Sequence, residues 1–327
     1  DGVLGKLIDL TAVFALLAGT ATTFSLATPL LSMALSRVLG IPENNFLTIG
    51  ILVIICVVYT MAVYFGMQGI AKLAASCVYL FFGLLAYFLL CGGETRYIIE
   101  TGITAVGNMV GMATWTDAMR TSSFPQNWTI FYWAYWMVWC VATPFFIGTI
   151  SKGRTIRQTV LGGYFFGLSG TFTSFIILGN YGLGLQMHGK LDLMGVYAKT
   201  GDLYQAIISI FETMPAAKAG LVLLAITMIA FYATSFDALT MVASSYSYKS
   251  LGAEEEPHKQ VKLFWAILLM LLPIALIFAE NSMANLQTVS IIAAFPIGFI
   301  IVMIVWSFFK DAGHYLDKEN SETRNME

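Results

Sequence analysis

The sequence predicts an all-α protein that crosses a membrane several times. Hydrophobic residues make up 58% of its 327 positions and charged residues only 11%, whereas soluble domains carry roughly 25% charged residues. Apolar runs of about 20 residues, long enough to cross a bilayer as helices, recur along the chain. The strands of a membrane β-barrel would instead be short segments of alternating hydrophobicity. These observations favour a polytopic bundle of membrane-spanning helices.

Eight spanning helices are predicted from the apolar runs and from the residues that interrupt them. The first ends before Pro42, the second at the turn around Gly66, and the third at Gly92, because proline and glycine are the poorest helix formers. The predicted spans cover residues 8–38, 46–65, 73–91, 128–150, 159–178, 219–246, 263–278 and 286–309. Residues 1–309 are therefore expected to form one transmembrane domain, and residues 310–327 a polar, partly disordered tail.

Two of the connections between spans are long. Residues 94–127 alternate small, polar and apolar side chains and are too polar to span. We expect an amphipathic helix on the membrane surface at about residues 97–112. Residues 180–214 contain polar stretches and are predicted to form a loop with one short helix.

Basic residues predict which side of the membrane each connection faces. They gather after the fourth span (Lys152, Arg154, Arg157), after the sixth (Lys249, Lys259, Lys262) and in the tail (Lys310, Lys318, Arg324). Alternating spans place these groups on one side, and basic loops face the cytoplasm. We therefore expect a multi-pass protein of the inner (plasma) membrane with a cytoplasmic C-terminus. The 180–214 connection, with Lys190 and Lys199, is a mild exception on the outer side.

The composition argues against several classes of function. A net charge of −2 without any basic domain gives no sign of nucleic-acid binding. The four cysteines lie in apolar segments without metal-ligand spacing, and the three histidines lie in loops or the tail. No catalytic triad, phosphate loop or zinc motif occurs, so neither an enzyme nor a bound cofactor is predicted. The chain begins directly before a spanning segment, and we expect it to be part of a longer protein.

An aromatic run in the fourth span is the clearest functional signal. Seven aromatic residues fall between its ends at Trp128 and Trp139, and Trp128, Tyr132, Tyr135 and Trp139 share one helical face, flanked by Trp133 and Trp136. An interfacial aromatic belt explains Trp128, but Trp136 and Trp139 lie roughly two to three turns deeper. Aromatic faces suit a cation without N–H donors, which binds through cation–π contacts. A quaternary ammonium ligand is as well supported by this pattern as a belt or core packing.

Hydroxyl groups in the sixth span are candidates for ion binding. Thr234 and Ser235 are adjacent, one turn after Phe231, and transporters often bind Na⁺ through hydroxyl and carbonyl oxygens. Such hydroxyls also bond back to their own helix, which is the commoner explanation. The nearby Asp237 is a further functional candidate, since an intramembrane carboxylate costs about 2.5–3.5 kcal/mol. A structural role for this carboxylate is slightly favoured.

Two other pairs of polar residues each have two interpretations. Thr20 and Thr23 share a face of the first span, where helix packing through small residues is favoured over a second ion site. Arg154 and Arg157, in the basic turn after the fourth span, most simply fix the topology. A role in gating is the alternative for these arginines.

Longer stretches of the sequence resemble one known family. WTIFYWAYW at residues 128–136 and ISKGRTIR at residues 150–157 resemble the aromatic helix and following turn of the betaine/choline/carnitine transporters, with Tyr135 where Trp is usual and Lys152 where Arg is usual. The opening IDLTAVFALLAGTATTFSLAT is similar to the family's fifth helix, FYATSFDALT at residues 231–240 to its tenth, and NLQTVSIIAAFP at residues 285–296 also fits. The resemblance covers essentially the whole chain.

This resemblance implies a LeuT-type inverted-repeat fold, in which the chain would hold the fifth to twelfth helices without the first four. It implies secondary transport of a small quaternary ammonium compound by alternating access, with Na⁺ as the coupling ion. Membrane lipid and a homotrimer are the partners it suggests. Substrate/product exchange and a LeuT-type carrier of amino acids or other amines remain alternatives. Alternatives from other classes are a membrane-embedded enzyme and a non-transporting osmosensor.

The resemblance also implies roles for individual residues of this sequence. Trp136 would be the main contact of the trimethylammonium group, and Trp133, Tyr135 and Trp139 would line the pathway beside it. Phe146 would form the cytoplasmic gate, together with Arg154 and Arg157. The Phe231 carbonyl and the Thr234 and Ser235 hydroxyls would form one sodium site. Thr20 would belong to a second, although Leu16 stands where the family has a threonine one turn earlier.

Overall fold

The computed structural model describes residues 2–64, 67–112, 115, 117–119, 121–249, 251, 255, 257–278 and 283–324. Within these ranges it leaves out the side chains of residues 45, 56, 59–64, 67–71, 145–146, 149–150, 276–278, 283–286, 319–320 and 322–324. Every regular element in the described part is helical, which confirms the predicted all-α class.

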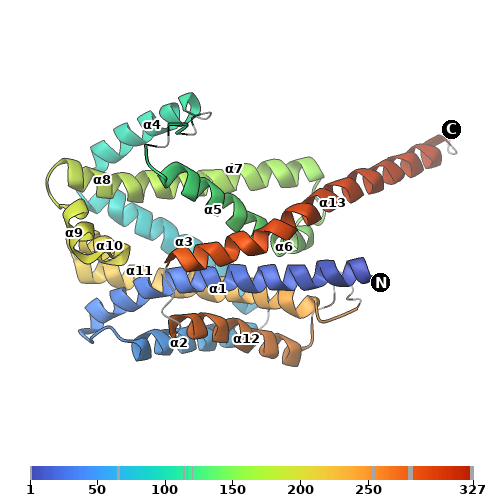
Figure 1. Ribbon diagram of the computed structural model, residues 1–327, viewed down its shortest axis with the longest axis horizontal. Coiled ribbons are helices and arrows are strands. Elements are labelled where there is room, and N and C mark those ends of the chain that lie inside the picture. The colour runs from blue at the N-terminus through green and yellow to red at the C-terminus, as the bar shows by residue number, and fades with distance from the viewer. Residues whose placement is uncertain are drawn as a thin grey trace.

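The helices follow one another along the chain with short connections. In order they are α1 (Val3–Leu39), α2 (Asn45–Tyr64), α3 (Met67–Cys91), α4 (Thr95–Gly111), α5 (Phe124–Trp139), α6 (Thr143–Ile150), α7 (Ile156–Ser174), η1 (Phe175–Gly179), α8 (Asn180–Met187), α9 (Leu193–Thr200), α10 (Leu203–Glu212), α11 (Ala217–Ser245), α12 (Lys259–Phe278) and α13 (Met283–Arg324). Figure 1 shows most of the long helices running roughly along one axis, with both termini at the same end.

Helix α1 lies at the centre of the bundle, where it packs against α5, α11, α12 and α13 (Figure 1). Most of its buried residues are alanine, glycine, serine or threonine, and such small side chains let membrane helices approach closely. The ring of Phe24 stacks on Phe236 of α11 with centroids 4.0 Å apart. On the other side of the bundle, the Phe88 and Phe211 rings meet edge-on at 4.9 Å. These ring contacts fix α11 and α10 in the core around α1 and α3.

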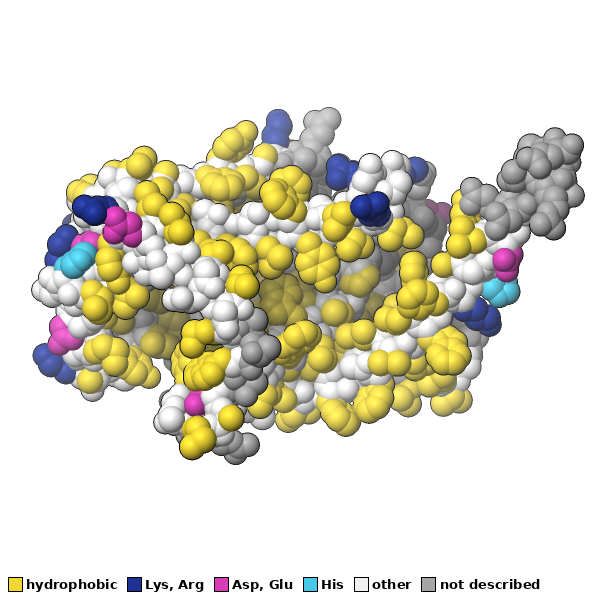
Figure 2. Space-filling view, turned by 90° about the horizontal axis from the view of Figure 1, so that it is seen from above, with side chains coloured by type: hydrophobic (Ala, Val, Ile, Leu, Met, Phe, Trp, Pro, Cys, Tyr) yellow, Lys and Arg dark blue, Asp and Glu magenta, His cyan; other side chains and the backbone are white. Residues whose placement is uncertain are grey.

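Within the described residues, five segments are long and apolar enough to cross a membrane: Val3–Leu39, Lys72–Cys91, Ile156–Met187, Ala217–Ser245 and Gln287–Lys318. They coincide with the first, third, fifth, sixth and eighth predicted spans. The second and seventh fall on α2 and α12, each 20 residues long. In Figure 2, hydrophobic side chains are spread over the whole visible face, and charged ones lie at its two ends and along its upper part. This surface suits a lipid environment.

The fourth predicted span, 128–150, is not one helix. The chain leaves the α-helical path at Cys140 and resumes it at Thr143, so that α5 and α6 are separate. At the break, the N–H groups of Cys140 and Ala142 bond to carbonyls only three residues back, at 3.1 Å each. The cause is Pro144, which has no N–H for the Cys140 carbonyl and whose ring crowds that carbonyl.

The fifth predicted span ends later than expected. Helix α7 continues through η1 into α8, so the helical segment runs to Met187 rather than to residue 178. Instead of a break, η1 forms one wide turn that keeps the helix continuous. The connection expected at 180–214 therefore holds the end of this helix and two short helices rather than one. Asp192 and Asp202 are the N-caps of these helices and accept hydrogen bonds from the Gly195 and Tyr204 N–H groups. Aspartate is a preferred N-cap residue, but the predicted loop did not take these two positions into account.

The two remaining expectations concern the surface helix and the tail. The helix predicted at about residues 97–112 is present as α4, which buries Ile98 and Gly102 and leaves most of its other side chains exposed. The tail was predicted to be partly disordered, but α13 continues as a helix to Arg324 and projects from the bundle (Figure 1). The polarity of residues 310–324 was taken as disorder. They contain one glycine and no proline, so nothing in them stops the helix.

Candidate functional site

The aromatic side chains of α5 form a continuous row along the helix. Ring centroids of Trp128 and Tyr132 are 5.5 Å apart, those of Phe131 and Tyr135 are 5.4 Å apart, and those of Tyr135 and Trp139 are 6.1 Å apart. Phe131 and Tyr132, at 5.6 Å, join the two halves of the row. Such separations are typical of interacting rings. The face predicted from helical periodicity therefore exists as one connected surface.

The row divides into a part that packs on the bundle and a part that does not. Tyr135 and Trp139 are partly buried, and Trp139 packs against the core around Phe24. Trp133 and Trp136 are 68% and 64% exposed. Trp136 stays next to the row, with its centroid 6.4 Å from that of Tyr135. The structure thus places the predicted ligand residues on one helix, with two indole rings free to receive a ligand or another helix.

A hydrogen-bond chain joins this aromatic row to α1. The Thr23 hydroxyl donates to the Gly19 carbonyl at 2.7 Å, and the Tyr135 hydroxyl lies 2.6 Å from the Thr23 oxygen. Because Thr23 has a single hydroxyl proton, the Tyr135 hydroxyl must be the donor to it. The chain therefore has one direction, from α5 to α1, and it fixes the Tyr135 ring.

Gly19 also sets the distance between these two helices. A Cβ atom at this position would lie 2.7 Å from Cγ1 of Val138, closer than packed carbon atoms approach. Val138 is fully buried at 1% exposure. The glycine therefore lets α5 lie close enough for the bond between Tyr135 and Thr23 to form.

The candidate ion residues lie on α11 and α1. The Thr234 hydroxyl donates to the Phe231 carbonyl at 2.9 Å, and Ser235 is partly buried beside it. On α1, the Thr20 hydroxyl donates to the Leu16 carbonyl at 2.7 Å and is fully buried. Both hydroxyls bond back to their own helix, which is the commoner explanation that the sequence offered for Thr234. The Phe231 and Thr234 oxygens nevertheless lie side by side, as ligands of one ion would.

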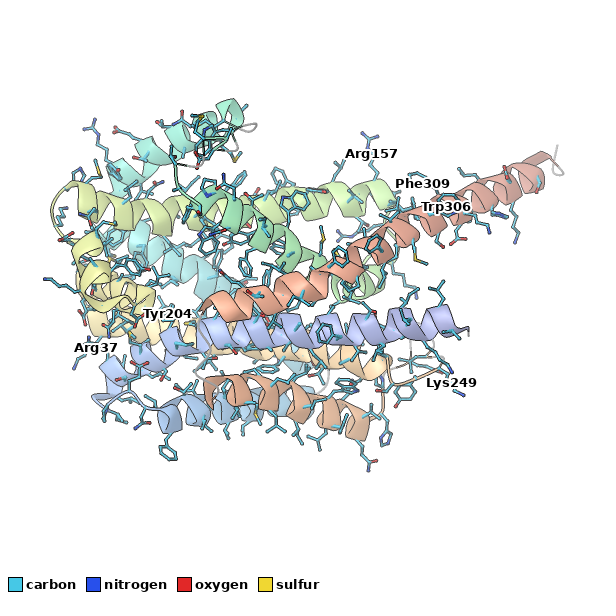
Figure 3. All side chains as sticks on the ribbon, viewed as in Figure 1. Arg37, Arg157, Tyr204, Lys249, Trp306 and Phe309 are labelled. Atoms are coloured by element: carbon cyan, nitrogen blue, oxygen red, sulfur yellow. The ribbon has the colours of Figure 1, made fainter. Side chains whose placement is uncertain are left out.

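The residues predicted to form a gate lie in α6, in the turn that follows it and at the start of α7. Arg154 and Arg157 are exposed there, and Thr155 begins α7 with a capping box shared with Gln158. Figure 3 shows Arg157 and Lys249 toward the end of the bundle that holds the termini, and Arg37 at the opposite end. The side chain of Phe146 lies outside the described residues.

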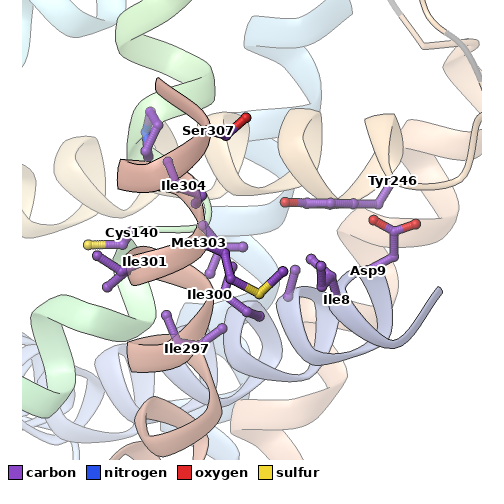
Figure 4. Close-up of a pocket in the computed structure, with 13 residues that line it drawn as sticks. Ile8, Asp9, Cys140, Tyr246, Ile297, Ile300, Ile301, Met303, Ile304 and Ser307 are labelled. Carbon is purple, nitrogen blue, oxygen red and sulfur yellow. The ribbon is translucent and has the colours of Figure 1, made fainter. Parts of the chain in front are cut away.

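A cavity of about 360 Å³ opens beside the break between α5 and α6. Cys140, Val141 and Pro144 of the break form one wall, and α1, α11 and α13 form the others (Figure 4). Asp9 and Tyr246 lie together on the side away from Cys140 (Figure 4). Sequence analysis missed this site because its residues are far apart in the chain and match no motif.

A buried carboxylate at the other end of the bundle was also missed. Glu94, between α3 and α4, is only 3% exposed and lies 2.7 Å from Lys190 Nζ and 2.9 Å from His188 Nδ1. Burial raises the pKa of this carboxyl, but hydrogen bonds and charges from Lys190 and His188 outweigh it and hold the pKa below its ordinary value. Gly184 of α8 packs directly over the carboxylate. The cluster ties α4 to α8.

Comparison with known proteins decides the family. The model of BCCT, the betaine/carnitine/choline family of transporters, matches residues 1–316. The chain belongs to this family. It is 28% identical over 94% of its length to a carnitine transporter of Acinetobacter baumannii, and 28% identical over its whole length to the glycine betaine transporter OpuD of Bacillus subtilis. It is 25% identical over 93% of its length to the uncharacterized transporter YeaV of Escherichia coli. It spans 56%, 62% and 64% of these relatives.

Proposed function

We propose that the protein to which this chain belongs moves small quaternary ammonium compounds across the membrane by alternating access, as a secondary transporter. The observation that carries the proposal is the aromatic row of α5, with Trp133 and Trp136 exposed beside it. Ring faces recognise a cation that cannot donate hydrogen bonds, and a desolvated contact is worth about 2 kcal/mol. Family membership and the names of the carnitine and glycine betaine relatives support the same substrate class.

We further propose that transport is coupled to Na⁺, bound by the Phe231 carbonyl with the Thr234 and Ser235 hydroxyls. Thr234 Oγ1 and the Phe231 oxygen are 2.9 Å apart, so both reach one cation once the Thr234 proton turns away. A second ion at Thr20 is less well supported, because the buried Leu16 offers no side-chain oxygen one turn earlier. Substrate/product exchange is the second candidate.

We also propose a location, an orientation and an oligomeric state for the protein. Residues 1–309 would form the transmembrane domain of a homotrimer in contact with membrane lipid, and residues 310–327 a cytoplasmic tail. Localisation in the inner (plasma) membrane follows from the transport function, and the orientation from the basic residues near Arg157 and Lys249. Phe146, Arg154 and Arg157 would form the cytoplasmic gate.

Uptake of radiolabelled betaine, choline and carnitine by cells that produce the full-length protein tests this function. We expect uptake of at least one compound, and a loss of about tenfold or more in kcat/KM in Trp136→Leu. Trp128→Leu, at the start of α5, is the matched control and should retain uptake. If none of the three compounds enters, the substrate proposal is wrong.

The ion proposal is tested in the same assay. Uptake should fall when Na⁺ is replaced by K⁺, and Thr234→Ala should raise the Na⁺ concentration needed for half-maximal uptake. A Thr234→Ala protein with unchanged sodium dependence would rule out this site. Uptake that does not depend on Na⁺ but is accelerated by substrate on the opposite side of the membrane would establish exchange instead.

A further inference from the structure

The cavity beside the α5–α6 break combines an apolar wall with a small acidic, acceptor-rich side. Most of its lining is aliphatic, including Ile300 and Ile304 of α13. Its charged or hydroxyl-bearing lining residues are Asp9, Tyr246 and Ser307, and no Lys, Arg or His is among the described residues that line it. Asp9 is close enough to act electrostatically on the Tyr246 hydroxyl. Within the described lining, the only full charge is therefore negative.

The helix break leaves a further hydrogen-bond acceptor on the Cys140 side of the cavity, opposite Asp9 and Tyr246 (Figure 4). In an unbroken helix the carbonyl of Cys140 would accept from the N–H of residue 144. That residue is Pro144, which has no N–H, and both residues line the cavity. The residues around the cavity thus supply a carboxylate, two hydroxyls and a carbonyl without its helical donor.

These features favour a cation whose own N–H groups can donate hydrogen bonds. A primary ammonium group has three N–H donors and pairs with a carboxylate through short charge-assisted hydrogen bonds. A quaternary ammonium has none and gains most from aromatic faces, and among the described residues that line this cavity Tyr246 alone is aromatic. The aliphatic wall suits a hydrocarbon chain attached to the ammonium group.

We propose that this cavity binds a primary ammonium group joined to an apolar chain, with the ammonium at Asp9 and Tyr246 and the chain along α13. Either a free alkylamine or an aminophospholipid presents this chemistry. The cavity is distinct from the aromatic row on α5 and rests on separate observations. Its occupant touches α1, α11, α13 and the α5–α6 break at once, and it therefore stabilises one arrangement of these helices.

Cys140 provides a reporter inside the cavity. The full-length protein is reconstituted in phosphatidylcholine vesicles and treated with N-ethylmaleimide, and alkylation of each cysteine is followed by mass spectrometry. Hexylamine is expected to slow alkylation of Cys140 about fivefold or more at saturation, without affecting the exposed Cys91. Hexyltrimethylammonium, with the same chain and no N–H donors, should leave the Cys140 rate unchanged.

Two comparisons identify the group that binds and its source. Asp9→Asn should raise the hexylamine concentration needed for half-protection about tenfold, whereas Glu100→Gln, an exposed carboxylate on α4, should not. Addition of phosphatidylethanolamine to the vesicles distinguishes the sources: protection by this lipid identifies an aminophospholipid, and protection by hexylamine alone identifies a free amine.

The same ligands are also tested by thermal unfolding, which decides the matter if Cys140 does not react in the empty protein. Hexylamine should raise Tm of the wild type more than that of Asp9→Asn. The proposal is wrong if neither amine source protects Cys140 or raises Tm. It is equally wrong if hexyltrimethylammonium acts as strongly as hexylamine, or if Asp9→Asn behaves like the wild type.

Discussion

The side chain of Tyr135 makes two kinds of contact. Its ring belongs to the aromatic row, and its hydroxyl donates to Thr23 on α1 at 2.6 Å. A tryptophan at this position, which the family resemblance would lead one to expect, has no hydroxyl to place there. The side chain is therefore both part of the proposed ligand surface and a tie between two helices.

Removal of this hydroxyl should affect binding more than folding. Tyr135→Phe keeps the ring but loses the bond to Thr23, at a cost of about 1 kcal/mol. We expect KM for the transported compound to rise about fivefold, because the ring is no longer fixed, with little change in Tm. Tyr132→Phe is the control. Thr23→Val should have a similar effect, and the double variant should be little worse than either single one, since both remove the same bond. Fully additive effects would contradict this.

Glu94 makes the stability of the protein depend on pH in acid. Its pKa is held below the ordinary value of 4.5 in the folded state, so the ionised carboxylate stabilises the fold above about pH 4.5. That stabilisation is lost as the pH falls through the folded pKa. Glu94→Gln should lower the free energy of unfolding by about 1–2 kcal/mol at pH 7, a modest value because Lys190 and His188 are half-exposed.

The measurement is Tm of wild type and Glu94→Gln in detergent between pH 7 and about pH 3. The two values should differ at neutral pH and converge in acid, where both side chains are uncharged. Glu100→Gln, which removes an exposed partner of Arg96, should show neither effect. A constant difference at all pH values would mean that the charge of Glu94 does not matter.

At the residue scale, the sequence predicted positions that depend only on the residue's own helix better than contacts that depend on a residue far away in the chain. The depth of Trp136 and Trp139 along α5 could be calculated from helical rise, and both lie on the aromatic surface. The bond between Tyr135 and Thr23 could not be predicted, because it joins positions 112 residues apart. For the same reason the contacts of Glu94 with His188 and Lys190 were not foreseen, although all three positions were visible as polar residues in connections.

At the scale of elements, the close contact between α1 and α5 depends on Gly19, which has no side chain. Gly19→Ala would place a methyl group 2.7 Å from Val138 Cγ1 and push the helices apart, which strains the bond at Tyr135. We expect a loss of about 1–3 kcal/mol in stability, typical of overpacking, and reduced uptake. The double variant Gly19→Ala/Val138→Ala removes the opposing methyl group and should recover much of both. Gly50→Ala, where a Cβ meets nothing within 4 Å, is the control; no recovery in the double variant would contradict this account.

The predicted helices agree with the structure where the composition of a long segment determines the helix. They disagree where one or two residues determine where a helix breaks or ends. Long apolar runs located the central helices α1 and α11 to within a few residues, and the start but not the end of α13. The break at residues 140–142 depends on one proline within an apolar run, and hydropathy does not register it. The extension of α7 through η1 was missed for the opposite reason, since Gly179 and Asn180 resembled an end but did not make one.

At the scale of the whole molecule, Arg157 and Lys249, from two of the basic groups in the sequence, lie toward the end that holds the two termini (Figure 3). This distribution predicts that residues 310–327 face the cytoplasm and that α9 faces outward. In a cysteine-free background, Ser321→Cys should resist a membrane-impermeant maleimide on intact cells and react after permeabilisation. Lys199→Cys, exposed on α9, should react in intact cells. The reverse pattern would invert the proposed topology.

The distribution of tryptophan gives the protein a built-in optical probe. Four of the seven tryptophans in these 327 residues (Trp128, Trp133, Trp136 and Trp139) lie on α5, so this helix contributes most of the intrinsic fluorescence of this part of the protein. Two of them are exposed and are accessible to a collisional quencher such as acrylamide. A compound that stacks on these rings shields them and shifts their emission, whereas a compound that merely crosses the bilayer does not. Ligand recognition by the unlabelled protein is thus observable by fluorescence, separately from movement across the membrane.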